Sequence, residues 1–248
     1  MKLLADLHTH TVYSHGKGTI EENVICAIKK GLKQIAITDH GLAHYAYGIN
    51  MKKLKNMRAE VDLLKQKYPE IDILLGVEAN LISHHGDIDV TEEAKKYLDF
   101  VIVGFHQAGR PNSVGAFFKF SMPNTLKIVT KKQIEINTNA YLKMLEKYDF
   151  ITCVAHLHYS CPVDAVKIAK ACLEKNVYVE LNGKRTLFSE QEIAEMVNLN
   201  VKFLMNSDAH SPQKVGDITH PFNVALVNGI PRELIANIDN MPVIKTIK

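Results

Sequence analysis

Seven short apolar runs, each followed by a polar residue, constrain the fold of this sequence more than any other feature. The runs cover residues 3–7, 35–37, 71–77, 100–103, 151–155, 177–181 and 201–205. Each has about the length of a β-strand, and several are rich in valine and isoleucine, as parallel strands buried on both faces are. The pattern therefore predicts seven parallel strands.

Helix signals separate these runs. Thr19 with Glu22 and Ser189 with Glu192 form capping boxes, and Gly31 is placed to end the first helix. Pro162 is expected to begin another helix. The inner faces expected of the second helix and of the Pro162 helix are Leu54, Met57, Val61 and Leu64, and Ala165, Ile168, Ala169, Cys172 and Leu173. Strand followed by helix, repeated about seven times, predicts a parallel α/β architecture.

Two segments depart from this rhythm. Residues 108–124 are rich in Gly, Pro, Asn and Phe and are expected to form a long loop, packed by Phe117, Phe118 and Phe120. Residues 86–90 are expected to form a small strand or hairpin. Because no linker or low-complexity tract divides the chain, we expect residues 1–248 to form a single domain.

The polar residues after the runs share one chemistry. The carboxyl ends of parallel strands in a barrel meet at one rim, where active sites form. The candidate metal ligands at that rim are His8, His10, His15, His40, Glu78, His106, His156, Asp208 and His210, and Asn182 follows the sixth run. Imidazoles and carboxylates without thiolates suit zinc, manganese or iron. These candidates exceed what one ion can use, so they imply two or three metals.

Composition excludes several functional classes. The net charge of +3 is too small to indicate a nucleic-acid or membrane-surface binder. No apolar run reaches the length of a membrane span, and the N-terminus turns polar at once, so we expect no signal peptide. Cys26, Cys153 and Cys172 are expected as reduced core residues, with Cys161 less easily assigned. We therefore expect a cytoplasmic protein; the sequence leaves its oligomeric state open.

The motifs resemble those of the PHP (polymerase and histidinol phosphatase) family. The similar segments, in order, are residues 6–11 with His15, 37–41, 76–80 with 104–106, and 206–210. Within the family the chain is most similar to the small stand-alone phosphatases of the YcdX type. The resemblance implies a distorted (β/α)7 TIM-like barrel with a trinuclear metal site at the C-terminal rim of the strands. The three divalent ions would be zinc, with manganese or iron as alternatives.

The resemblance also implies a distribution of ligands. The three metals would take His8, His10, Glu78 and Asp208; Glu78, His106 and His156; and His15, His40 and His210. The chain departs from the family at His158, where Gly is frequent, and at Asn206, where Gly often precedes Ser-Asp. His158 could add a contact that the family pattern lacks. We interpret His44, His84, His85 and His220 as surface histidines.

The implied activity is that of a metal-dependent phosphoesterase acting on small phosphate monoesters. A metal-bound hydroxide generated by the ligands Glu78, Asp208 and His106 would attack phosphorus. Asp6 and Asp39 are candidates to orient ligand imidazoles from behind, or else are strand-end caps. Arg110 and Arg185 are candidates to bind the substrate phosphate, or else are solvated rim residues.

Other functions remain open from the sequence. Within the family they are histidinol-phosphate phosphatase and polymerase-type exonuclease, although no stable nucleic-acid binding is expected. An amidohydrolase-like hydrolase would also use His-x-His on its first strand, but His15, His40 and His210 supply a third metal that it does not need. A non-catalytic metal-stabilised scaffold is the remaining alternative, and closed coordination would distinguish it.

Overall fold

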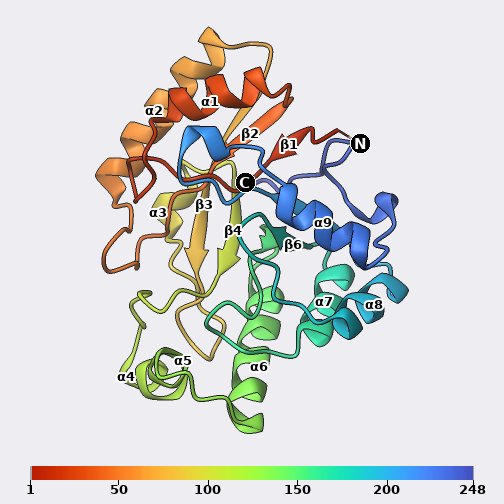
Figure 1. Cartoon of the computed structure of the whole chain (residues 1–248). Helices are drawn as coiled ribbons and strands as arrows, with labels where there is room; N and C mark the ends of the chain where they lie inside the picture. Colours follow the sequence, from red (N-terminus) through yellow and green to blue (C-terminus); the bar gives the residue numbers. More distant parts are fainter. Residues whose placement is uncertain (1, 248) are drawn as a thin grey trace.

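The computed structural model describes residues 2–247 as a barrel of seven parallel strands in the order β1 to β7 (Figure 1). The strands are β1 Ala5–Asp6, β2 Gln34–Ile37, β3 Asp72–Asn80, β4 Phe100–Gly104, β5 Ile151–Val154, β6 Tyr178–Asn182 and β7 Phe203–Asn206. Each strand pairs with its neighbour in sequence. The distorted (β/α)7 barrel expected from the sequence is therefore confirmed.

Helices cover the outside of the barrel. The main ones are α1 Ile20–Lys29, α2 Met51–Lys67, α3 Glu92–Lys95, α6 Lys131–Lys147, α7 Ala165–Glu174, α8 Glu190–Asn198 and α9 Thr219–Val227. Both capping boxes are present, and the apolar stripe of α2 is buried. Gly31, at φ +75°, takes the left-handed conformation that ends α1. No helix within residues 2–247 is long and apolar enough to cross a membrane.

Two expectations about local structure were wrong: the start of one helix and the presence of a long loop. The helix after the fifth strand begins at Ala165 rather than Pro162, because the Asp164 side chain accepts the Lys167 N–H and so caps it. Residues 108–124 are not one long loop. They contain α4 Val114–Ala116, a π-helical turn over Phe117–Ser121 and the start of α5 Met122–Thr125, which lie beside α6 in Figure 1.

Buried amides hold this helical insertion in place, which composition could not reveal. Asn124 and Asn137 exchange side-chain hydrogen bonds of 2.9 and 2.8 Å. Phe120 is buried edge-on to Phe105, whereas Phe117 and Phe118 are exposed. The expected hairpin at residues 86–90 is present only as an antiparallel bridge between Leu81 and Ile88.

The barrel interior is divided into an apolar and a polar part. The apolar part contains Ala5, Leu7, Ala36, Phe100, Ile102, Cys153 and Leu204. Gly76 makes room for Phe100, because a Cβ at Gly76 would lie 2.6 Å from that ring. The inward positions nearer the carboxyl ends carry polar residues, among them Glu78 and Glu180. All four cysteines are unpaired; Cys153, Cys161 and Cys172 are buried, and Cys26 is half-buried.

The C-terminal segment fills the junction between β7 and β1. Asn237 Nδ2 donates to the carbonyls of Ala5 (2.9 Å) and Met205 (2.6 Å), and Asn237 Oδ1 accepts from Met205 N (3.0 Å). Near the site, Thr9 and Ala209 form a parallel bridge that closes the barrel. One buried amide side chain therefore replaces strand pairing where β1 is only two residues long.

We predict that Asn237→Ala lowers the free energy of unfolding by about 3 kcal/mol, because it leaves buried backbone groups of two strands without partners. Urea denaturation measures this loss. Asn228→Ala is the control, since the Asn228 amide makes one hydrogen bond to Val224 in a half-buried position. Equal stability losses in the two variants would contradict the role assigned to Asn237.

Candidate metal centre

The carboxyl ends of the strands bring the predicted imidazoles and carboxylates together. Four groups have ligand atoms that all lie within 4.8 Å of one another. They are His8, His10 and Asp208; His8, Glu78 and His156; His40, Glu78 and His106; and His10, His40 and His210. Eight of the nine predicted ligands thus fall into overlapping groups.

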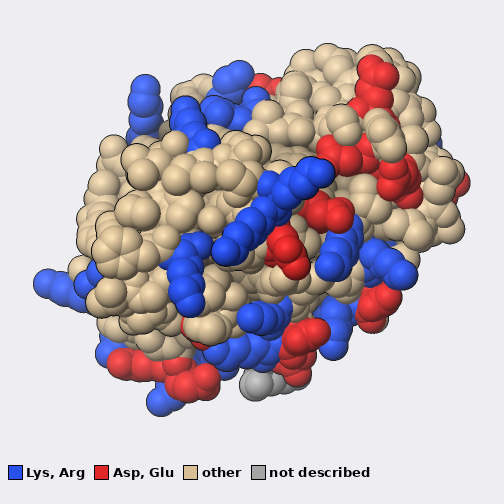
Figure 2. All heavy atoms as spheres, turned by 90° about the horizontal axis from the view of Figure 1, so that it is seen from below, with Lys and Arg blue, Asp and Glu red and all other residues tan. Residues whose placement is uncertain are grey.

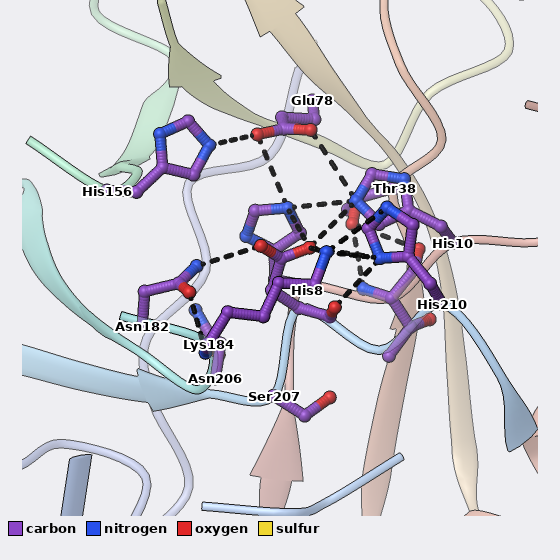
Figure 3. Close-up of polar contacts among 12 residues, drawn as sticks. His8, His10, Thr38, Glu78, His156, Asn182, Lys184, Asn206, Ser207 and His210 are labelled. Carbon is purple, nitrogen blue, oxygen red and sulfur yellow. Dashed lines mark hydrogen bonds and ion pairs between the residues drawn. The ribbon is translucent and has the colours of Figure 1, made fainter. Parts of the chain in front are cut away.

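Glu78 contacts imidazoles from several strand ends, and Figure 3 shows it joined to His156 on one side and to His8 and His10 on the other. Its Oε1 lies 2.5 Å from His156 Nε2 and 3.2 Å from His106 Nε2. Its Oε2 lies 2.9 Å from His40 Nδ1 and 3.5 Å from His10 Nε2. The two oxygens of one carboxylate therefore face different imidazoles, which is the arrangement a bridging ligand needs.

The donor atoms fit divalent cations. His8 Nε2 and His10 Nε2 face each other at 3.2 Å, and both lie within 3.7 Å of Asp208 Oδ1. The buried atoms His10 Nδ1, His40 Nδ1 and Glu78 Oε2 make no well-formed hydrogen bond within residues 2–247, although the last two lie 2.9 Å apart. Buried polar atoms without partners are costly, so convergent unpaired donors of this type indicate ligands.

Glu180 fixes the orientation of His8. Its Oε1 accepts a 2.8 Å hydrogen bond from His8 Nδ1 and a 2.9 Å bond from Asn206 Nδ2. Its Oε2 accepts from the His156 backbone N–H and from Asn182 Nδ2. With its Nδ1 proton committed to Glu180, His8 presents the lone pair of Nε2 to the cluster, as a metal-ligating histidine does.

A second chain of hydrogen bonds orients His106. Its Nδ1 donates to Asn80 Oδ1 at 2.8 Å, and Asn80 Nδ2 donates in turn to Asp89 Oδ2 at 2.6 Å. His106 Nε2 is thereby directed toward Glu78. The neighbouring His156 has room because residue 104 is glycine; a Cβ there would lie 2.4 Å from the His156 ring.

Two candidate ligands, His156 and Asp208, are among the eight non-glycine residues with positive φ within residues 2–247. His156 has φ +30° and Asp208 has φ +50°, a region that side-chain-bearing residues rarely adopt. Asn182 Nδ2 holds Asp208 Oδ2 at 3.2 Å. Lys184 Nζ lies 3.1 Å from Asp208 Oδ1 and beside the ring of His210 (Figure 3). His210 Nδ1 donates to the Asp208 carbonyl at 2.9 Å, so the ion-pair partner of the lysine is Asp208.

The electrostatics favour neutral imidazoles beside charged carboxylates. Burial lowers the pKa of His15 to about 4 and that of His40 to about 3. Burial alone would raise the pKa values of Glu78 and Asp208, but the surrounding imidazoles outweigh it and hold both pKa values well below their usual range. These protonation states are the ones that metal ligation requires.

His8 and His156 depart from this pattern. Burial would lower the pKa of His8, but the charges of Glu180, Glu78 and Asp208 raise it well above its usual value. Burial would likewise lower the pKa of His156, but its contact with Glu78 raises it. A cation placed among these carboxylates would compete with that proton, so metal binding here is expected to depend on pH.

Asp6 and Asp39, predicted to orient imidazoles, instead hold backbone. Asp6 accepts hydrogen bonds from Ser207 Oγ (2.5 Å) and Gly216 N (2.7 Å). Asp39 accepts from the backbone and hydroxyl of Thr11, at 2.8 and 2.6 Å. Neither carboxylate contacts an imidazole within residues 2–247. They fix the segments that carry the ligands, and burial raises the pKa of Asp39 to about 6.

Three histidines near the cavity or the strand ends belong to none of the four ligand groups. His15 stacks on His40, with ring centroids 4.8 Å apart, but belongs to none of the four ligand groups. His44, expected at the surface, is half-buried, stacks on His40 at 4.7 Å and lines the central cavity. His158 turns away from the ligands and pairs with Glu192 at 2.9 Å.

The remaining histidines lie outside the cluster. His85 and His220 are exposed, as expected. His84 is partly buried against His85, with ring centroids 4.0 Å apart.

The cavity next to the cluster has a volume of about 240 Å³. Arg185 lines it and lies over the ring of Tyr159, 4.7 Å from the centroid. Arg110, the other predicted phosphate ligand, lines a separate hollow with Leu42 and Pro111. Besides Arg185, the central cavity is lined by Lys184 and His44, which the sequence did not indicate as substrate-binding residues.

Sequence reasoning missed the residues behind the ligands. Glu180 is a carboxylate at an inward position of an apolar strand. Asn80 is the last residue of the third-strand motif, and Asp89 follows that motif in the chain. An acid in a strand expected to be buried is a signal that could have identified Glu180, because such a charge needs partners. Asn80 and Asp89 offered no comparable signal, since their contacts depend on the local hairpin.

Comparisons with known proteins agree with this geometry. A family model described as "PHP domain" matches residues 6–184. A probable phosphatase of Thermoanaerobacter sp. strain X514 is 30% identical, with 96% of this chain and 92% of the relative covered. A probable phosphatase of Shewanella frigidimarina is 31% identical, covering 96% and 90%.

A solved structure shares the fold. The histidinol phosphate phosphatase of Lactococcus lactis, crystallised with zinc, L-histidinol and phosphate, has 18% identity and a TM-score of 0.63. The match covers 93% of this chain and 95% of that one. The family model spans most of the chain and begins at the end of β1, just before His8 and His10. The chain belongs to the PHP-domain family.

Proposed function

We propose that this protein is a metal-dependent phosphatase that hydrolyses small phosphate monoesters. The observation that carries the proposal is the buried Glu78 carboxylate, whose two oxygens face separate groups of imidazoles. Such a ligand holds two cations close together, which suits in-line displacement at phosphorus. The relatives named probable phosphatases support the same reaction class.

We propose three divalent cations, zinc in the first place, with manganese or iron as alternatives. His8, His10, Glu78 and Asp208 would hold one; Glu78 would also hold the second, together with His106 and His156; and His40 and His210 would hold the third, with His15 beside it. When bound, such cations supply a water-derived nucleophile near neutral pH and neutralise phosphoryl charge. Glu180 and Asn80 orient His8 and His106 toward these positions.

Side chains at the cavity are placed to bind and orient the substrate. Arg185 supplies a planar donor fork for phosphoryl oxygens, supported by Tyr159 beneath it. His44 accepts the Tyr47 N–H at Nδ1 (3.1 Å), and burial lowers its pKa to about 4. The neutral ring therefore carries its proton on Nε2, which is available to donate to a substrate oxygen.

Histidinol phosphate is a less favourable substrate than a neutral or anionic monoester. The Lactococcus lactis enzyme is named for that compound, and it shares only the fold with this chain. Lys184 and Arg185 flank the cavity here and would repel the ammonium group of histidinol. Direct assay of phosphate release from histidinol phosphate compares the two possibilities.

We predict that Glu78→Gln and His106→Ala reduce bound metal and lower p-nitrophenyl phosphate turnover by at least about a thousandfold, since each removes a ligand facing the shared position. Elemental analysis and steady-state kinetics measure the two effects. His85→Ala is the control, because His85 is exposed and outside the ligand groups. The proposal fails if both ligand variants keep full metal loading and full activity.

Glu180→Gln tests the support behind His8. Both Glu180 oxygens accept hydrogen bonds, so the amide of Gln would place a donor against donors, and we expect about 2 kcal/mol less stability. Metal affinity should fall by about 10- to 100-fold. Zinc titration calorimetry and urea denaturation measure these changes, with the exposed Glu190→Gln as control. Unchanged zinc affinity in Glu180→Gln would refute this role.

A further inference from the structure

A second hollow lies beside the metal centre and shares one wall with it. Lys184, Asp208 and His210 line both the central cavity and this hollow, which has a volume of about 560 Å³. Its other walls come from residues outside the ligand set: Lys17, Gly183, Ser207, Ser211, Gln213, Lys214 and Asp217. A molecule bound at the metals can therefore extend past Lys184 into a defined space.

The hollow has an excess of one positive charge, because three lysines and two aspartates line it. The three lysines are Lys17, Lys184 and Lys214. The Lys17 ammonium makes no ion pair within residues 2–247, and the Lys17 backbone is fixed by a 2.9 Å hydrogen bond to the His210 carbonyl. This hydrogen bond fixes the Lys17 wall of the hollow to His210, a candidate metal ligand.

The two acids in the hollow already have partners. Asp208 faces His8, His10 and Lys184. Asp217 pairs with Lys214 at 2.9 Å and accepts from Thr219 Oγ1 at 2.8 Å. The positive charge of Lys17 is therefore not cancelled locally.

The distribution of charge on this face fits a small local binding site rather than a broad surface for a polyanion. Figure 2 views the molecule from the side toward which β3 and β4 run, and basic and acidic side chains alternate there. A polyanion such as nucleic acid would need a continuous basic surface. A small group entering one basic hollow does not.

From this arrangement we infer that the hollow is a subsite for a second anionic group of the substrate, a carboxylate or a further phosphate. The inference rests on the proposed phosphatase function and names its substrate class: phosphate monoesters whose alcohol portion carries a second negative charge. Lys184 lies between the two positions and contacts the group that links them. Lys17 and Lys214 contact the distal anion.

Two pairs of substrates isolate the second charge. 3-Phosphoglycerate and glycerol 3-phosphate have the same carbon chain and differ in a carboxylate against a hydroxymethyl group. Fructose 1,6-bisphosphate and fructose 6-phosphate differ in a second phosphate. In at least one pair, we expect kcat/KM to be about tenfold higher for the member that carries the second anionic group, mainly through a lower KM. We expect this preference to weaken with added salt.

Lys17→Gln and the double variant K17Q/K214Q test the residues. Each replaces an ammonium group by an uncharged polar amide. In the double variant the ratio of kcat/KM values within a substrate pair is expected to fall below about threefold. K132Q/K170Q is the charge-matched control, since both lysines are exposed and distant in sequence from the hollow. It should retain the preference. Thermal unfolding of each variant checks that the fold is intact.

The outcomes separate this inference from the function beneath it. Equal kcat/KM values within both substrate pairs, or a preference that survives in K17Q/K214Q, would overturn the subsite. Carboxylate and phosphate are distinguished by which pair shows the preference. Failure of the metal-loaded protein to release phosphate from p-nitrophenyl phosphate or any of the four substrates would instead overturn the proposed phosphatase function.

Discussion

The Glu78 carboxylate, buried among imidazoles inside the barrel, is the constraint on which the rest of the site depends. A charge in this position is stable only if opposite charges or donors surround it. His8, His10, His40, His106 and His156 all approach its two oxygens. Each of these imidazoles comes from or just after a different strand end, apart from the His8–His10 pair, so the carboxylate requires the whole rim to assemble correctly.

The barrel supplies this assembly through residues that never contact the cluster centre. Glu180 and Asn80 direct two imidazoles, and Asp6 and Asp39 secure the segments that follow β1, β2 and β7. Asn237 bridges the junction where β1 is too short to pair along its length. These hydrogen bonds fix the backbone and the imidazoles of the charged site, and they preorganise side chains that would otherwise repel one another.

The same geometry explains where substrate recognition lies. The ligand cluster is charged, buried and convergent, whereas Lys184, Arg185 and Lys17 are exposed at its edge. The proposed function and the proposed subsite thus place chemistry at phosphorus and discrimination between alcohol portions in separate parts of the site. Changes at the edge can alter substrate preference while the ligand set stays intact.

The sequence by itself determined the seven strands, the capped helices and the side chains that meet in the candidate metal centre, because these depend on local patterns: apolar runs, capping boxes and polar residues at strand ends. It failed at Pro162 and at residues 108–124, where Asp164 and the Asn124–Asn137 pair decide the local structure. Only the tertiary structure revealed that Glu180 supports His8, that His44 lines the cavity and that Lys17 lines a hollow beside Asp208 and His210. These relations join residues far apart in the chain, and contacts across a barrel leave no periodic signal in the sequence.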